Sequence, residues 1–377
     1  MANLALYLHI PFCHSRCSYC SFLSTAGRTA EIPEYIHALV VELYHRKIAR
    51  STLKSVYFGG GTPSLLNASH IANIFKAICE HYSIADDAEI TLEANPDSID
   101  TAYLYNLREI GINRVSLGAQ SLDDDELNLL GRQHSAAEIK IVMRHARTAG
   151  FGNLSLDFIY GIPGRNINDW RTMLREIISL RAEHLSLYAL SIDEGTALAE
   201  AVKRCEISPP NPDAAACEYE LACEILAGAG YEQYEISNWS RPGYESRHNL
   251  TYWTGGDYLG LGCGAHSFLD GVRYAGTNSL DEYLAALGTG HAPPQTADAI
   301  TPQVALGEAV MLGLRLNAGI SADDIWARFK IDLQGYFRTE IDELVALGLL
   351  TVNEGRLRLT PRGRLLGNEV FLRFMPN

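Results

Sequence analysis

Several features common in other classes of protein are missing from this sequence of 377 residues. No run of about 18 apolar residues could span a bilayer, and the N-terminus lacks the basic segment of a targeting peptide. There is no surplus of positive charge, since 31 basic and 45 acidic residues give a net charge of −14. This balance disfavours a general surface for nucleic acid or anionic membranes. We therefore expect a soluble cytoplasmic protein without a transmembrane segment.

A disulfide framework is also missing. Five of the eight cysteines are scattered without a repeated spacing, as suits a reducing compartment. The other three, Cys13, Cys17 and Cys20, fall within eight residues in a C-x3-C-x2-C pattern. Thiolates this close together can hold a metal or an iron–sulfur centre on one loop. Because no fourth cysteine lies nearby, the pattern favours a four-iron cluster with one open iron over a closed zinc site.

A less specific interpretation is that these cysteines simply pack in the core, since free cysteine is often buried. The residues between them argue against it, because Ser15, Arg16 and Ser18 make a poor core segment. The triad therefore predicts a cluster site.

Short apolar runs alternate with amphipathic stretches after the cysteine loop. The runs expected to be strands are 4–8, 55–58, 89–93, 114–117, 154–159 and 184–190, and the stretches expected to be helices are 32–47, 68–82, 101–110, 136–149 and 167–181. Strands that alternate with helices form parallel sheets. We expect an α/β fold in which six such units form an open, partial (β/α)6 barrel.

Polar or glycine-rich segments follow five of these strands. They are the cysteine loop, residues 59–64, 93–96, 118–121, and Asp157 with 160–164. Ligands bind in such folds where the loops after the strands converge, at the carboxyl ends of the strands. Glycines at 59–61 would let the peptide backbone approach a bound cofactor closely. The five segments therefore predict one cofactor site along one rim of the barrel.

The end of the chain has a different pattern. Helices are expected over 302–316, 321–329 and 333–347, and strands 349–352 and 356–360 flank a Glu354-Gly355 turn. This pattern indicates a winged-helix-like α+β domain. Residues 301–377 hold nine basic and nine acidic residues, so no positive field exists to collect phosphates, and a partner-docking or structural role is favoured over nucleic-acid binding. We predict three parts: 1–240, a connector over 241–295, and 296–377.

With the cysteine triad and the glycine loop one unit later, the sequence resembles the radical S-adenosylmethionine (SAM) superfamily. The resemblance implies a [4Fe-4S] cluster on Cys13, Cys17 and Cys20, and SAM bound to the open iron through its amino and carboxylate groups. The sequence also resembles the oxygen-independent coproporphyrinogen dehydrogenases, and this resemblance covers nearly the whole chain. The segments that carry it are 7–13, 59–64, 93–96, 118–121 and 157–164. The SAM contacts that this resemblance implies are Tyr7, Tyr19, Gly60, Gly61, Thr62, Glu93, Gln120, Arg132 and Asp157.

Two departures separate the chain from those dehydrogenases. The position of their additional cysteine is occupied by Phe22, and their N-terminal extension before the first strand is absent. Both features match the HemW-type branch of haem chaperones. That branch carries an H-N-x-x-Y-W motif, found here at residues 248–253.

The motif implies a haem site made by His248, Asn249, Tyr252 and Trp253. Imidazole is a common axial ligand of haem iron, and aromatic rings can pack against a macrocycle. His248 is the expected iron ligand, with His266 and Cys263 as alternatives. A less specific interpretation makes His248 a hydrogen-bonded core histidine within an aromatic cluster.

The resemblance implies a haem chaperone that delivers haem to apoproteins such as respiratory haem enzymes. One alternative is an oxygen-independent coproporphyrinogen III dehydrogenase, and another is a radical SAM enzyme that acts on haem itself. A further interpretation assigns the cluster to assembly, homodimer formation or gating of haem transfer, without radical turnover.

Overall fold

The computed structural model describes residues 2–46, 48 and 51–376. Its main sheet has twelve strands in the order β14-β13-β12-β11-β1-β4-β5-β6-β7-β8-β10-β9. The centre is a run of parallel strands in chain order, namely β1 (Ala2–Ile10), β4 (Ser51–Gly60), β5 (Ser83–Ala94), β6 (Arg114–Gln120), β7 (Leu154–Tyr160) and β8 (His184–Ala189). The six expected strands are confirmed, and because the strand order is linear the sheet stays open.

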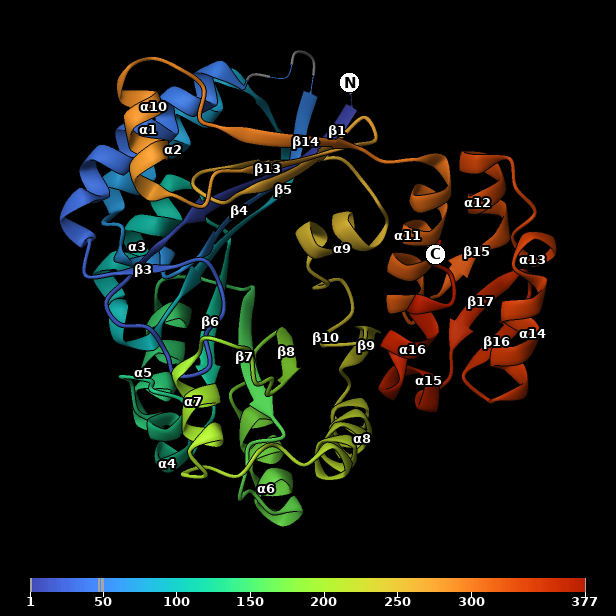
Figure 1. Cartoon of the computed structure of the whole chain (residues 1–377). Helices are drawn as coiled ribbons and strands as arrows, with labels where there is room; N and C mark the ends of the chain where they lie inside the picture. Colours follow the sequence, from blue (N-terminus) through green and yellow to red (C-terminus); the bar gives the residue numbers. More distant parts are fainter. Residues whose placement is uncertain (1, 47, 49–50, 377) are drawn as a thin grey trace.

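Helices between these strands lie on the outer face of the curved sheet (Figure 1). They are α1 (Ile32–His45), α2 (Ala68–His81), α3 (Thr101–Ile110), α4 (Asp124–Leu129), α5 (Ala136–Thr148) and α6 (Ile167–Ser179). Most of these helices begin with a side-chain N-cap. The Asn67 side chain accepts a hydrogen bond from the His70 amide, and Ser135 forms a capping box with Glu138. The expected end of the first helix at Lys47 lies outside the described residues.

The two faces of the parallel sheet differ in polarity. Residues such as Val56, Phe58 and Leu92 belong to the apolar core beneath the helices. The alternate positions, which point to the opposite face, are polar: Ser55 pairs in register with Glu89, and Asp157 with Ser186. The inside of this sheet is therefore a hydrophilic surface, unlike the packed apolar interior of closed (β/α)8 barrels.

The chain returns to the main sheet after β8. It passes through α7 (Ala197–Lys203), α8 (Pro212–Gly228), β9 (Glu232–Glu235), β10 (Asn238–Ser240) and α9 (Arg247–Trp253), and then adds β11 (Tyr258–Leu261), β12 (His266–Leu269), β13 (Val272–Gly276), α10 (Leu280–Gly288) and β14 (Gln295–Ala299). Strand β11 pairs in parallel with β1, on the edge opposite β4. The segment 241–295, which the sequence predicts as a connector, thus contributes strands to the main sheet. The three-part division itself stays a prediction.

The C-terminal region forms a separate group of helices and strands beside the main sheet (Figure 1) and has its own apolar core. It contains α11 (Pro302–Arg315), β15 (Ile320–Ser321), α12 (Ala322–Phe329), α13 (Leu333–Tyr336), α14 (Arg338–Ala346), β16 (Leu350–Asn353), β17 (Arg356–Leu359), α15 (Pro361–Leu365) and α16 (Gly367–Leu372). Strands β16 and β17 form the expected hairpin, and β15 joins them. The single helix expected over 333–347 is wrong: Phe337 leaves helical geometry (φ −105°, ψ 33°), and its buried ring packs edge-on against Phe374.

Candidate cofactor site at the carboxyl ends of the strands

The three clustered cysteines line one cavity of about 450 Å³. Cys13 is buried in β2 (Phe12–Cys13), directly after β1, and Cys17 and Cys20 are half-buried in the loop that follows. The loop is tied to the rim through Ser18, whose amide donates to the Leu130 carbonyl at 3.1 Å and whose carbonyl accepts from the Leu198 amide at 2.7 Å. The scaffold therefore orders the loop that presents the thiols.

The thiols have polar partners. Thr62 Oγ1 donates to Cys13 Sγ at 3.5 Å, and Arg132 Nη1 donates to Cys17 Sγ at 3.3 Å. Burial raises the pKa of the Cys13 thiol. Among the described residues, no three His, Cys, Asp or Glu side chains converge as ligands of a single metal ion. Three free thiols around a cavity larger than an ion fit a cluster better than a mononuclear site.

The glycine loop after β4 is bonded to the cysteine strand. The Gly61 amide donates to the Ile10 carbonyl at 2.8 Å, and the Thr62 amide donates to the Phe12 carbonyl at 2.8 Å. A Cβ on Gly61 would stand 2.7 Å from the Phe12 carbonyl oxygen. Glycine at this position is thus required by the neighbouring backbone, in addition to the approach of a cofactor expected from the sequence.

Two half-buried carboxylates lie further along the rim. Glu93 accepts from the Tyr57 hydroxyl at 2.7 Å and from the Gly60 amide at 3.2 Å. Burial raises the pKa of Glu93 to about 7, against the opposing effect of the bond from Tyr57. Burial also raises the pKa of Asp157, which accepts from Ser116 Oγ at 3.3 Å. Both groups can accept hydrogen bonds from an ammonium or a hydroxyl group.

Most of the residues that the resemblance implies as SAM contacts meet at this cavity. Its lining includes the three cysteines together with Tyr19, Gly60, Gly61, Thr62, Glu93, Gln120, Arg132 and Asp157. Tyr7 does not belong to the lining; its hydroxyl lies 3.0 Å from His9 Nδ1 inside the sheet. Sequence reasoning missed Tyr188, which lines the cavity from β8. The alternation of His184, Ser186 and Tyr188 along that strand was the available signal.

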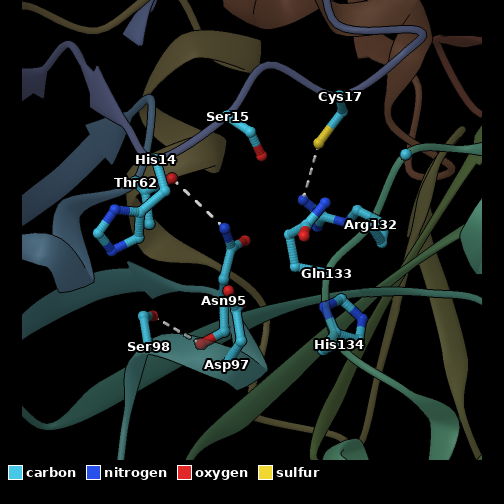
Figure 2. Close-up of a pocket in the computed structure, with 11 residues that line it drawn as sticks. His14, Ser15, Cys17, Thr62, Asn95, Asp97, Ser98, Arg132, Gln133 and His134 are labelled. Atoms are coloured by element: carbon cyan, nitrogen blue, oxygen red, sulfur yellow. Dashed lines mark hydrogen bonds between the residues drawn. The ribbon is translucent and has the colours of Figure 1, made fainter. Parts of the chain in front are cut away.

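A small pocket adjoins the cavity below the cysteine loop (Figure 2). Figure 2 shows Arg132 pointing toward Cys17, and Asn95 pointing toward Thr62, to whose Oγ1 its Nδ2 donates at 3.3 Å. A second guanidinium nitrogen of Arg132, Nη2, donates to the Gly118 carbonyl at 2.7 Å. The third, Nε, is buried without a hydrogen-bond partner among the described residues. Arg132 therefore joins the cysteine loop to β6 and keeps one donor free.

The HNxxYW motif lies elsewhere, on the polar inside of the sheet. His248 is buried; its Nδ1 is 2.9 Å from Ser55 Oγ, and its Nε2 is 2.7 Å from the Tyr252 hydroxyl. Burial lowers the pKa of His248 to about 3, helped by the nearby charge of Arg114. Because both ring nitrogens have hydrogen-bond partners, His248 has the environment expected of a core histidine within an aromatic cluster.

The rest of the motif helix α9 contacts the C-terminal region. Arg315 of α11 lies over the Trp253 ring at 4.3 Å, and its Nη2 donates to the buried Glu235 carboxylate at 3.1 Å. Asn249 and Tyr252 are half-buried. Glu89 of β5 accepts bonds from the Arg247 and His248 amides at 3.1 Å each, so a carboxylate of the main sheet holds the start of the helix.

The two alternative ligands differ in exposure. His266 is exposed on β12. Cys263 is buried and donates to the Thr277 carbonyl at 3.3 Å, and burial raises its pKa to about 11. Of these two side chains, only His266 is open to a ligand that arrives from solvent.

No helix in the described part of the chain has the length and apolar character needed to cross a membrane. The sequence profile of the radical SAM superfamily matches residues 7–177, and that of the HemN C-terminal domain matches residues 300–366. The solved structure of coproporphyrinogen III oxidase (HemN) from Escherichia coli superposes with a TM-score of 0.87 at 26% identity, covering 99% of this chain and 90% of that one.

Curated relatives match over nearly the whole length. The heme chaperone HemW of Bacillus subtilis is 33% identical over 98% of both chains, and that of Mycobacterium tuberculosis is 36% identical over 97% of this chain and 93% of its own. The mitochondrial radical S-adenosyl methionine domain-containing protein 1 of Mus musculus is 35% identical over 99% of this chain and 87% of its own. The family membership expected from the cysteine triad and the HNxxYW motif is confirmed, and the chain belongs to the HemW family of radical SAM proteins.

Proposed function

We propose that this protein is a cytoplasmic haem chaperone, which binds haem and transfers it to apoproteins such as respiratory haem enzymes. The observation that carries the proposal is the match of 33–36% identity, over nearly the full length, to proteins named heme chaperone HemW. Exposure of Phe22, at the position where coproporphyrinogen dehydrogenases carry a further cysteine, is consistent with it.

The cavity at the strand ends is proposed to hold the cofactors. Cys13, Cys17 and Cys20 would ligate a [4Fe-4S] cluster, which supplies single-electron chemistry to SAM when bound. Arg132 is suited to pair with the SAM carboxylate, because a guanidinium forms strong charge-assisted bonds with carboxylates. Glu93 and Asp157 are suited to accept bonds from ammonium or ribose hydroxyl groups.

Haem is proposed to bind beside α9. Ligation by His248 requires its ring to leave Ser55 and Tyr252, because both nitrogens are engaged. His266 is the alternative ligand that is already exposed. Ligation by His248 suits haem transfer, because the His248 ring can bond again to Ser55 and Tyr252 when the haem leaves.

A haem titration followed by absorbance, together with an anaerobic assay for coproporphyrinogen consumption on the same preparation, tests the function. We expect saturable haem binding without consumption of coproporphyrinogen. The same titration on His248→Ala and His266→Ala identifies the ligand, since loss of the ligand changes both the spectrum and the affinity. Absence of haem binding, or formation of protoporphyrinogen with stoichiometric deoxyadenosine, would contradict the proposal.

A further inference from the structure

One side chain connects the HNxxYW motif with the cofactor cavity. Tyr57, on β4, stacks on the His248 ring with 4.8 Å between centroids and 24° between planes. Its hydroxyl donates to Glu93 Oε1 at 2.7 Å. Tyr57 is therefore in direct contact with the proposed haem ligand on one side and with a carboxylate of the cavity on the other.

The position of Tyr57 depends on the rings around it. Tyr7 of β1 stacks beside Tyr57 at 6.2 Å and lies 6.3 Å from His248. Ser55, two residues earlier on the same strand, contacts His248 Nδ1. In a close-packed interior, removal of one ring from such a group leaves its neighbours without part of their contacts. Movement of the His248 ring would therefore remove part of the packing of Tyr57.

Glu93 in turn contacts the glycine loop, which lies against the cysteine loop. The second oxygen of Glu93 accepts from the Gly60 amide at 3.2 Å, and Gly61 packs against the strand that carries Cys13. Glu93 and Gly60 both line the cavity. A change in the orientation of Tyr57 would therefore alter a carboxylate and a backbone amide of the cavity in which SAM is proposed to bind.

We propose that Tyr57 is a positioning residue that couples haem ligation at α9 to the binding of SAM in the cavity. The inference rests on the proposed function, because it needs haem to draw the His248 ring away from Tyr57. The bistable element is that ring: in one arrangement it is held by Ser55 and Tyr252 and stacks on Tyr57, and in the other it ligates iron. Because coupling between two sites is reciprocal, SAM must change the affinity for haem by the same factor.

The experiment measures the dissociation constant of SAM by anaerobic equilibrium dialysis of the cluster-loaded protein, with and without saturating haem. In the wild type we expect haem to weaken SAM binding about fivefold or more, as is typical of coupled sites. In Tyr57→Phe, which keeps the ring but removes the bond to Glu93, the ratio of the two constants should approach one. Tyr103→Phe is the matched control, since it also removes one hydroxyl bond, to the Leu66 carbonyl, and should keep the wild-type ratio.

Two further variants decide the origin of the effect. Glu93→Asp withdraws the carboxylate from the Tyr57 hydroxyl and should also bring the ratio toward one, even if Tyr57→Phe folds poorly. Ser55→Ala removes a His248 contact without touching the bond between Tyr57 and Glu93, and should keep the ratio above one.

The outcomes separate the two proposals. A wild type that binds haem with unchanged SAM affinity overturns the coupling and leaves the chaperone function standing. A Tyr57→Phe protein that keeps the wild-type ratio overturns the role of Tyr57. A wild type that binds no haem contradicts the proposed function, and the coupling falls with it.

Discussion

Gly61 packs so closely against Cys13 that a Cβ on the glycine would stand 2.9 Å from the cysteine sulfur. Cys13, the first of the proposed cluster ligands, and the loop after β4 are therefore in direct contact, and a Cβ on Gly61 does not fit between them. Both positions are held by hydrogen bonds that the Gly61 and Thr62 amides donate to the Ile10 and Phe12 carbonyls.

Gly61→Ala is expected to impair cluster loading severely. The new methyl group would meet two backbone carbonyl oxygens at 2.7 and 2.9 Å as well as the Cys13 sulfur, so the cysteine loop must shift. The measurement is iron and sulfide content after anaerobic reconstitution. Gly152→Ala is the matched control, because no atom lies within 4 Å of its Cβ position. Equal iron content in the two variants would contradict the role of the contact.

The buried His248 is expected to make the protein less stable as the pH falls. Its pKa is about 3 in the folded protein and about 6.5 in the unfolded chain, so below pH 6.5 the unfolded state takes up a proton that the folded state does not. At pH 5 the linkage lowers the free energy of unfolding by about 2 kcal/mol relative to pH 8.

Urea unfolding of wild type and His248→Gln at several pH values measures this linkage. The difference in unfolding free energy between the two proteins should shift against the wild type from pH 8 to pH 5. His291→Gln serves as the control at an exposed position. A difference for His248→Gln that stays constant with pH would show that the imidazole is not buried in the neutral form.

Arg315→Ala is expected to destabilise the contact between α9 and the C-terminal region. It leaves the Glu235 carboxylate, which has no exposed surface, without its cation, and it removes the guanidinium from the Trp253 ring. Because Arg315 is itself partly exposed, we expect a loss of about 2–3 kcal/mol in the free energy of unfolding. Arg373→Ala, which breaks the exposed pair with Glu343, should cost less than about 1 kcal/mol. Equal losses in urea unfolding would contradict the importance of the buried pair.

The parallel sheet could be predicted because each of its strands has an apolar outer side and is followed by an amphipathic helix. The residues after these strands could also be placed on one rim, so the strand pattern predicts that Cys17, Glu93 and Asp157 lie around one site, whereas Arg132 follows only from the resemblance to the radical SAM family. These predictions succeed because they depend on local periodicity and on the common direction of parallel strands.

The environment of α9 could not be predicted in the same way. Glu89 holds the start of this helix and Ser55 contacts His248, over separations of 158 and 193 residues for the Glu89–Arg247 and Ser55–His248 pairs. The sequence around Glu89 and Ser55 contains no local pattern that predicts these distant partners. The break at Phe337 was missed for a related reason, since its ring packs against Phe374, which is distant in sequence.

The pairing of β1 with β11 has a consequence for synthesis of the chain. Tyr7 and Gly260 are register partners, so one edge of the first strand has no neighbour until residues beyond 260 have left the ribosome. At translation rates of about 5–20 residues per second, this edge stays open for roughly ten seconds or more. Unpaired strand edges invite association with other chains. The nascent polypeptide therefore carries its cysteine loop next to an unpaired strand edge, and protection of that edge during translation becomes a condition for a good yield of folded protein.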